Sequence, residues 1–114
     1  MEASAKGVKM EKNTCALVSA DEKATVIAVS GEMNSANSAR IESGLLAIRA
    51  AHPSGSLHID ASVLDGISSS GANVFKRIRN NESNMSVRNA KPEIYKALRK
   101  HGLTELIHIE KNAI

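Results

Sequence analysis

Short β-branched and apolar runs alternate along this chain with stretches of helical period, and this alternation constrains the fold most. The expected order is β-β-α-β-α-β-α-β. Strands joined by helical crossovers lie parallel in one sheet, whereas the first two, separated by "ADEK", read as an antiparallel hairpin. The pattern predicts a single α/β domain with a mixed, mostly parallel sheet of about five strands and helices packed on it. The expected strands are residues 15–19, 25–30, 56–62, 85–89 and 105–109.

Boundary residues place the three helices. The first is expected to begin at Asn34 or Ser35, either of which can cap it, and to stop at the Pro-Ser-Gly of residues 53–55. The second starts near Ser69, and "VLDGI" before it reads as a connection. The third is the clearest, because Pro92 suits the first helical position and Gly102 suits the left-handed residue after a helix end.

Length and composition indicate one domain with an aliphatic core. The 114 residues are 42% hydrophobic but only 2% aromatic, and we expect a flexible segment over 1–12 and the domain over 13–114. The formal net charge is +3, and the basic residues are spread along the chain with acidic residues among them. The two aromatic side chains offer no stacking platform for single strands. No direct nucleic-acid binding is therefore expected.

The sequence has no long apolar run and a single cysteine, which limits the classes of protein to which it can belong. No run approaches the roughly 18 apolar residues of a membrane span, and the first residues lack the apolar stretch of a signal peptide. Cys15 is the single cysteine, so no intrachain disulfide can form. We therefore expect a cytoplasmic domain, with Cys15 as an inert buried thiol in a strand.

Motifs that carry enzyme chemistry are absent from the sequence, and we expect no enzyme activity, cofactor or metal site. Asp60 and Asp65 straddle a loop and could form an acid–base pair, but loop aspartates more often shape turns. The four histidines are interpreted as surface or helix-end residues: His52, His58, His101 and His108.

The stretch "ISSSGANVF" places three serines and a glycine at the expected helix start. Two interpretations stay open: a serine here is an ordinary N-cap, or it presents a regulatory hydroxyl, whose phosphate the helix N-terminus would tolerate. Gly71 has no side chain, so another backbone could approach closely. Lys76, Arg77 and Arg79 on the same helix either steer an acidic partner or form a solvated face.

These residues resemble the signature of STAS domains, especially bacterial anti-sigma factor antagonists. In "SLHIDASVLDGISSSGANVF", Asp60 matches the strand-end Asp of the family. Ser69 matches its phosphorylated serine, and Ser70 and Gly71 complete the D-S-S-G motif. "VIAVSGEMN" is similar to an apolar strand followed by G-E-L-D, and "PEIYKALRKHGLTELIHI" to the closing helix, turn and strand. The resemblance covers roughly residues 15–109.

The resemblance implies a partner switch. Unmodified at Ser69, such a protein binds an anti-sigma factor, often a serine kinase; phosphorylation breaks the complex, and a serine phosphatase restores it. The implied partner-binding residues are Asn34, Ser68, Ser69, Ser70, Gly71 and Lys76, and the implied state is a monomer or weak dimer.

This sequence departs from the family pattern at two positions and at its end. Ser68 and Asn34 replace the Asp of D-S-S-G and the Asp of G-E-L-D, which removes negative charge near Ser69. A phosphate would then be easier to hold, or the docking geometry of the kinase would be lost. The chain also ends five residues after Ile109, so the family's final helix is expected to be missing or very short, leaving a patch of the sheet to a partner.

Two other functions remain open. The domain could be a STAS subunit of a larger assembly, such as a stressosome-like scaffold or a lipid-transport complex, that docks through the same helix end without a phosphate cycle. It could instead be a small enzyme or ligand-binding domain that uses the strand ends, a reading that the lack of a paired catalytic constellation disfavours.

Overall fold

In the part of the chain that the structure describes, five strands form one mixed sheet in the order β1-β2-β4-β6-β7. The structure is a computed structural model that describes residues 11–112; the predicted segment 1–12 thus lies mostly outside the described residues. β1 pairs antiparallel with β2, and the other pairs are parallel, which confirms the predicted sheet. The strand bounds are β1 Cys15–Ala20, β2 Ala24–Val29, β4 Ser56–Asp60, β6 Met85–Ala90 and β7 His108–Lys111.

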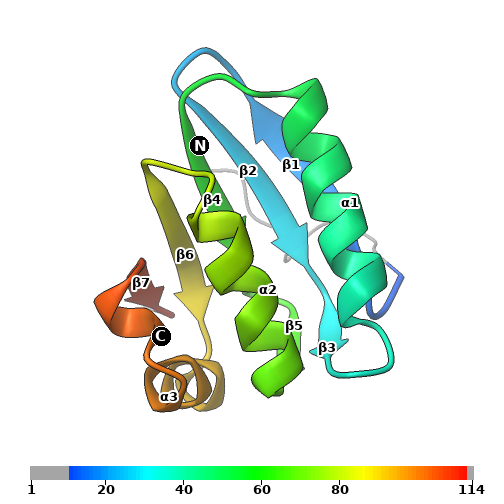
Figure 1. The fold of residues 1–114 in the computed structure, drawn as a ribbon, viewed down its shortest axis with the longest axis vertical. Helices are drawn as coiled ribbons and strands as arrows, with labels where there is room; N and C mark the ends of the chain where they lie inside the picture. Colours follow the sequence, from blue (N-terminus) through cyan, green and yellow to red (C-terminus); the bar gives the residue numbers. More distant parts are fainter. Residues whose placement is uncertain (1–10, 113–114) are drawn as a thin grey trace.

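The helices that connect these strands are α1 Ser38–Ala51, α2 Ser69–Arg79 and α3 Pro92–Lys100. α1 and α2 lie side by side over one face of the sheet, whereas α3 lies at the end of the molecule where α2 begins (Figure 1). α3 follows its sequence signals closely: Pro92 occupies its first turn and Gly102, with φ of 79°, terminates it.

A second, two-stranded sheet was missed by the sequence analysis. β3 (Gly31–Met33) and β5 (Leu64–Ile67) pair in parallel. The prediction that "VLDGI" is a connection is therefore wrong. The two strands are short and hold Gly31 and Gly66, residues that weaken a strand pattern, so only their pairing identifies them.

Three predicted boundaries are also wrong: the strand predicted over 56–62 ends at Asp60, and two other elements begin later than expected. α1 begins at Ser38, because Asn34 caps a turn instead: its Oδ1 accepts the N–H of Ala36 (2.9 Å) and of Asn37 (3.3 Å). The last strand begins at His108 rather than at residue 105, because a 3-10 turn over Leu103–Glu105 comes first.

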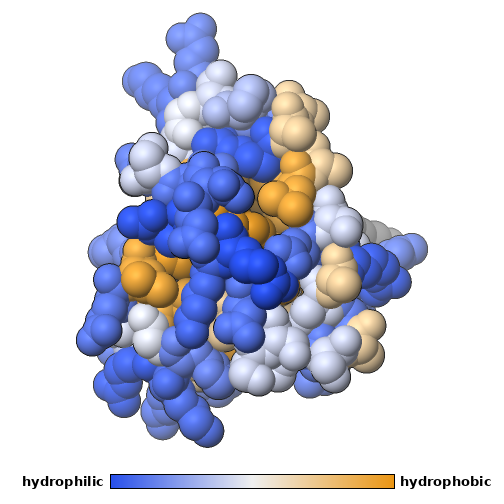
Figure 2. Space-filling model, in the orientation of Figure 1, coloured by the Kyte–Doolittle hydropathy of each residue, from blue (hydrophilic) through white to orange (hydrophobic). Residues whose placement is uncertain are grey.

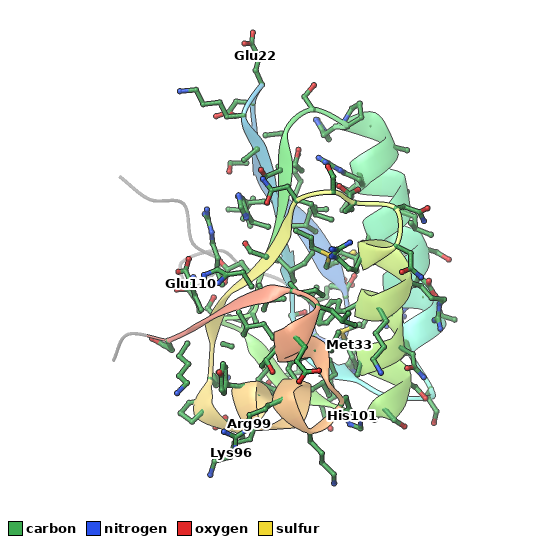
Figure 3. The ribbon with its side chains drawn as sticks, turned by 60° about the vertical axis from the view of Figure 1, so that its left-hand side comes forward. Glu22, Met33, Lys96, Arg99, His101 and Glu110 are labelled. Carbon is green, nitrogen blue, oxygen red and sulfur yellow. The ribbon has the colours of Figure 1, made fainter. Side chains whose placement is uncertain are left out.

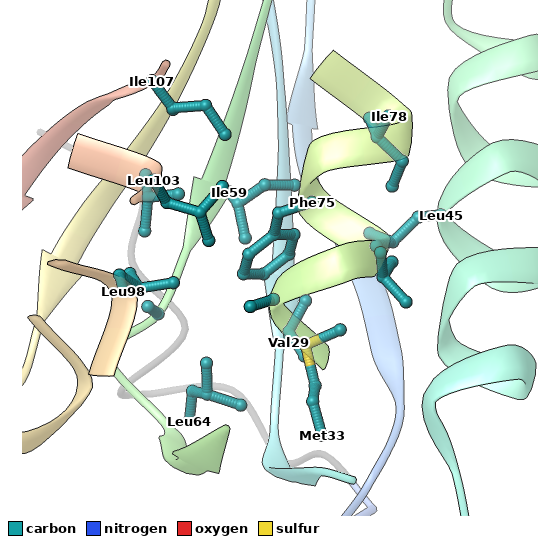
Figure 4. Close-up of a cluster of buried hydrophobic side chains, with 14 of the residues drawn as sticks. Val29, Met33, Leu45, Ile59, Leu64, Phe75, Ile78, Leu98, Leu103 and Ile107 are labelled. Carbon is teal, nitrogen blue, oxygen red and sulfur yellow. The ribbon is translucent and has the colours of Figure 1, made fainter. Parts of the chain in front are cut away.

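The core is aliphatic around a single aromatic ring. Phe75 of α2 is fully buried among side chains of the sheet, α1, β5 and the segment after α3 (Figure 4). Each connecting helix contributes to the same cluster, so α2 is held on several sides and its first residue has a defined position. The fully buried large side chains include Ile27, Met33, Ile41, Leu57, Ile59, Leu64, Ile94, Leu98 and Leu103.

Candidate functional site

The small sheet brings the two family-motif segments together. Met33 and Ile67 are paired residues at the carboxyl ends of β3 and β5, so Asn34 and Ser68 leave the same edge. The Ser68 N–H donates to the Met33 carbonyl at 2.9 Å, directly beside Asn34. This hydrogen bond therefore holds Ser68 next to Asn34, the two positions at which the sequence departs from the family motifs.

The three serines have distinct environments at the start of α2. Ser68 is the N-cap residue, with extended backbone, and its carbonyl accepts the Ala72 N–H at 2.9 Å. Its Oγ is buried and has no hydrogen-bond partner among the described residues. Ser69, the first helical residue, is exposed, whereas Ser70 is half-buried. The prediction that the second helix starts near Ser69 is confirmed, but the N-cap serine forms no side-chain cap.

Gly71 is buried, which corrects the expectation that a partner's backbone lies against it. A Cβ at this position would lie 2.6 Å from the Met33 Cβ, 2.8 Å from the Met33 carbonyl oxygen and 2.8 Å from the Ile67 Cγ1. The close approach that glycine permits is thus made inside the domain, between α2 and the small sheet.

The basic residues of α2 serve different purposes. Arg77 forms a two-bond ion pair with Glu42 of α1, at 2.8 and 2.9 Å, and the guanidinium holds the pKa of that carboxyl below its usual value. Arg79 donates to the carbonyls of Leu106 (3.0 Å) and Glu82 (3.2 Å). Lys76 is half-buried and makes no ion pair within residues 11–112. Arg77 and Arg79 are therefore engaged in contacts within the domain, and Lys76 is left as the cation of this helix that a partner could meet.

Asp60 and Asp65 are not arranged as an acid–base pair. Asp60 is buried and its Oδ1 accepts the Ser62 N–H at 2.9 Å, which shapes the turn after β4. Asp65 lies in β5, not in a loop, is exposed, and pairs with Lys91 at 2.6 Å. Each carboxylate thus has a structural contact of its own.

One polar pair was missed by the sequence analysis. His58 of β4 and Ser86 of β6 are neighbours across the sheet, with 2.5 Å between Nδ1 and Oγ. Burial, followed by the charge of Arg88, lowers the pKa of His58. His58 is therefore a mid-strand residue rather than a surface or helix-end one. Only strand register reveals the pair, since 28 residues separate its members.

The surroundings of Cys15 do not activate its thiol. Burial raises the pKa of the half-buried Cys15 thiol, which fits an inert residue. Within residues 11–112, no three His, Cys, Asp or Glu side chains gather as metal ligands. The helices described there are all too short or too polar to cross a bilayer.

Family and structural comparisons agree with this geometry. A family model described as the STAS domain matches residues 16–113. The chain belongs to the STAS domain family. No curated protein matches this STAS domain.

Solved structures share the STAS fold at low sequence identity. The anti-sigma factor antagonist SpoIIAA, in its unphosphorylated form, has a TM-score of 0.64 and 17% identity, covering 83% of this chain and 86% of that one. An anti-sigma factor antagonist from Mycobacterium paratuberculosis has a TM-score of 0.71 and 19% identity, covering 86% of each chain. The murine anion transporter Slc26a9 has a TM-score of 0.70 and 12% identity, covering 83% of this chain and 17% of the transporter. At these identities the likeness is one of fold.

Proposed function

We propose that this STAS domain is a phospho-regulated partner switch, an anti-sigma factor antagonist without enzyme activity. Unmodified, it binds an anti-sigma factor or serine kinase in the cytoplasm, and phosphorylation of Ser69 releases that partner. The observation that carries the proposal is the position of Ser69, which is exposed as the first residue of α2. A serine phosphatase would restore the binding form.

The helix start explains why a phosphate would change binding but not the fold. The first-turn N–H groups of α2 have no acceptor within the helix, and the helix dipole favours negative charge there. In the complex the same phosphate, of charge about −1.5 to −2, would be desolvated against a surface shaped for a hydroxyl. An unpaired buried charge costs several kcal/mol, and about 1.4 kcal/mol is already tenfold in affinity.

The partner surface in this proposal is small and continuous. It holds Ser69 and Ser70, the neighbouring turn at Asn34, and Lys76 farther along α2. Ser68 and Gly71 contribute by position, since the Ser68 Oγ and Gly71 are buried beneath this surface.

The test compares substitutions at neighbouring serines. Ser69→Asp and Ser69→Glu are expected to weaken binding of the anti-sigma factor or kinase, measured by calorimetry, by well over tenfold. Ser69→Ala should bind about normally and resist release, while Ser70→Ala should remain switchable. Intact mass after incubation with the kinase should show one added phosphate in the native chain and in Ser70→Ala, but none in Ser69→Ala.

A static docking role is the second candidate, and Asn34 and Ser68 favour it, because both replace the Asp of family motifs beside the serine. In that role the domain is a subunit of a scaffold or transport assembly. Equal affinity of Ser69→Ala and Ser69→Asp, with no phosphate gained at Ser69, would support this role and contradict the switch.

A further inference from the structure

A hollow on the outer side of α3 is lined by three cationic side chains and, among the described residues, by no acidic one. It has a volume of about 280 Å³ and is lined by Pro92, Tyr95, Lys96, Arg99 and Lys111. Four of these residues lie on one side of α3, at spacings of three and four, and Lys111 comes from the end of β7. We call this surface the α3–β7 hollow.

Among the described residues, the cations of the α3–β7 hollow form no ion pair. Lys96 and Arg99 are exposed and make no ion pair within residues 11–112, although Glu93 lies one turn before Lys96. Lys111 instead places its ammonium 4.5 Å from the centre of the Tyr95 ring, a weak attraction at an exposed site.

Glu93 and Glu110 are the acidic side chains nearest in sequence to the lining residues, and neither forms an ion pair with them among the described residues. Glu110, next to Lys111, lies 4.0 Å from His108, and Figure 3 shows it well apart from Lys96 and Arg99. Three cations around one small hollow attract anions over about a Debye length, roughly 8 Å at physiological salt.

We propose that the α3–β7 hollow binds an acidic segment of a protein partner, rich in Asp and Glu. Charge complementarity is the reason: carboxylates along an extended segment can reach Lys96, Arg99 and Lys111 at once. The proposal does not depend on the phosphate switch, because Ser69 and the Asn34 turn take no part in this hollow.

Other anionic partners fit the hollow less well. A membrane surface calls for exposed apolar side chains beside the cations. Within residues 11–112 the exposed large hydrophobic residues are Leu17, Leu46 and Leu106, none of which lines the hollow, and the surface over α3 is hydrophilic in Figure 2. A small phosphate ligand is usually enclosed, whereas Lys96, Arg99 and Lys111 are all exposed. Nucleic-acid bases need an open ring to stack on, and Lys111 covers Tyr95.

Tyr95 makes the hollow directly observable. It is the single tyrosine in a chain without tryptophan, so the intrinsic emission of the full chain reports on this site. We would titrate an end-capped decaglutamate peptide into the ¹⁵N-labelled chain at roughly 0.02 M salt and follow both tyrosine emission and amide shifts. Saturable emission and amide shifts confined to α3 and the end of β7 are expected.

Two charge-reversal variants of equal net charge distinguish binding at the hollow from a general effect of net charge. Lys96→Glu combined with Arg99→Glu should weaken peptide binding at least tenfold, as should raising salt to roughly 0.3 M. Lys12→Glu combined with Lys23→Glu alters net charge equally at exposed sites outside the hollow and should bind within about twofold of the native chain. A decaglutamine peptide should produce no shift.

Several outcomes would overturn the proposal. These are shifts spread over the whole surface, equal losses in the two double variants, or no binding at low salt. Binding of pyrophosphate or of phosphatidylserine vesicles through the same residues, tighter than that of the peptide, would assign the hollow to a phosphate ligand or a membrane instead.

Discussion

Gly71 determines where Ser69 lies, although Ser69 is the residue that a partner would meet. The bare Cα lets α2 rest directly on Met33, whose carbonyl also accepts the Ser68 N–H. The serine segment is therefore attached to β3 through van der Waals contact on one side and a hydrogen bond on the other. A side chain at residue 71 would push α2 away from Met33 and so disturb both the contact and the hydrogen bond.

Gly71→Ala is expected to destabilise the domain by about 1–3 kcal/mol, because a methyl group 2.6 Å from the Met33 Cβ forces α2 away from the small sheet. Urea unfolding followed by circular dichroism measures this. Ser70→Ala, in the same helical turn, should change stability by less than about 0.5 kcal/mol. A Gly71→Ala variant as stable as Ser70→Ala would contradict the packing described here.

His58 should make stability depend on pH. Its pKa lies below the ordinary value of 6.5, so between 6.5 and its folded pKa the unfolded chain binds the proton more readily. The contribution of His58 is therefore fully present above about pH 6.5 and is lost as the pH falls through that window. His58→Asn should reduce the loss of stability between pH 8 and pH 5, whereas His108→Asn, at a side chain 74% exposed, should leave it unchanged. Urea midpoints at the two pH values decide this; identical pH dependence in both variants would refute it.

At the scale of elements, two ion pairs of different strength connect α1 to α2 and to the loop that follows α2. Arg49 meets Glu82 through two bonds of 2.9 and 3.0 Å, and both side chains are only 13% exposed. The Arg77–Glu42 pair has similar geometry, but the Arg77 side chain is 55% exposed. Burial therefore makes the Arg49–Glu82 pair, which joins α1 to the loop after α2, the one whose disruption should cost more stability.

Arg49→Ala is expected to lower the free energy of unfolding by about 3 kcal/mol, because Glu82 would be left mostly buried without its counterion. The Arg49 guanidinium also donates to the carbonyls of His52, Ser54 and Gly55, and these bonds would be lost as well. Arg77→Ala is the control and should have little effect. Equal urea midpoints for the two variants would show that burial does not distinguish the pairs.

Elements with local boundary signals could be predicted from sequence, and those defined by pairing could not. α3 was placed by Pro92 and Gly102 alone, and Ser69 was placed at a helix start by the change from strand to helix pattern. β3, β5 and the His58–Ser86 contact depend on partners 28 or more residues away, so no local pattern indicates them. Asn34 had the right capping chemistry but caps a turn, which propensity does not distinguish from a helix.

At the scale of the whole molecule, the fold depends on one ring. Phe75 is 0% exposed and lies between the main sheet, α1 and the segment around Leu103 (Figure 4). With aromatic residues so few, no neighbouring ring can fill space that Phe75 leaves. Aliphatic side chains surround it on every side, and the three helices meet the sheet around it.

Phe75→Ala is therefore expected to cost about 3–5 kcal/mol, a large share of the 5–15 kcal/mol that typically stabilises a domain. Leu46→Ala, at a side chain that is 47% exposed, should cost less than about 1 kcal/mol. Thermal unfolding of the two variants tests this. A Phe75→Ala variant that melts close to the native chain would mean that the core repacks without the ring.

The hydrogen bond from Ser68 to Met33 makes one amide a reporter of the serine segment. Solvent deuterium reaches that N–H only when β3 and the start of α2 separate, so its exchange rate measures the opening of this region apart from global unfolding. An occupant that clamps the region slows this exchange, and a modification that loosens it accelerates it. The amide of Ser68 would thus register events at Ser69 even when the remainder of the domain keeps its protection.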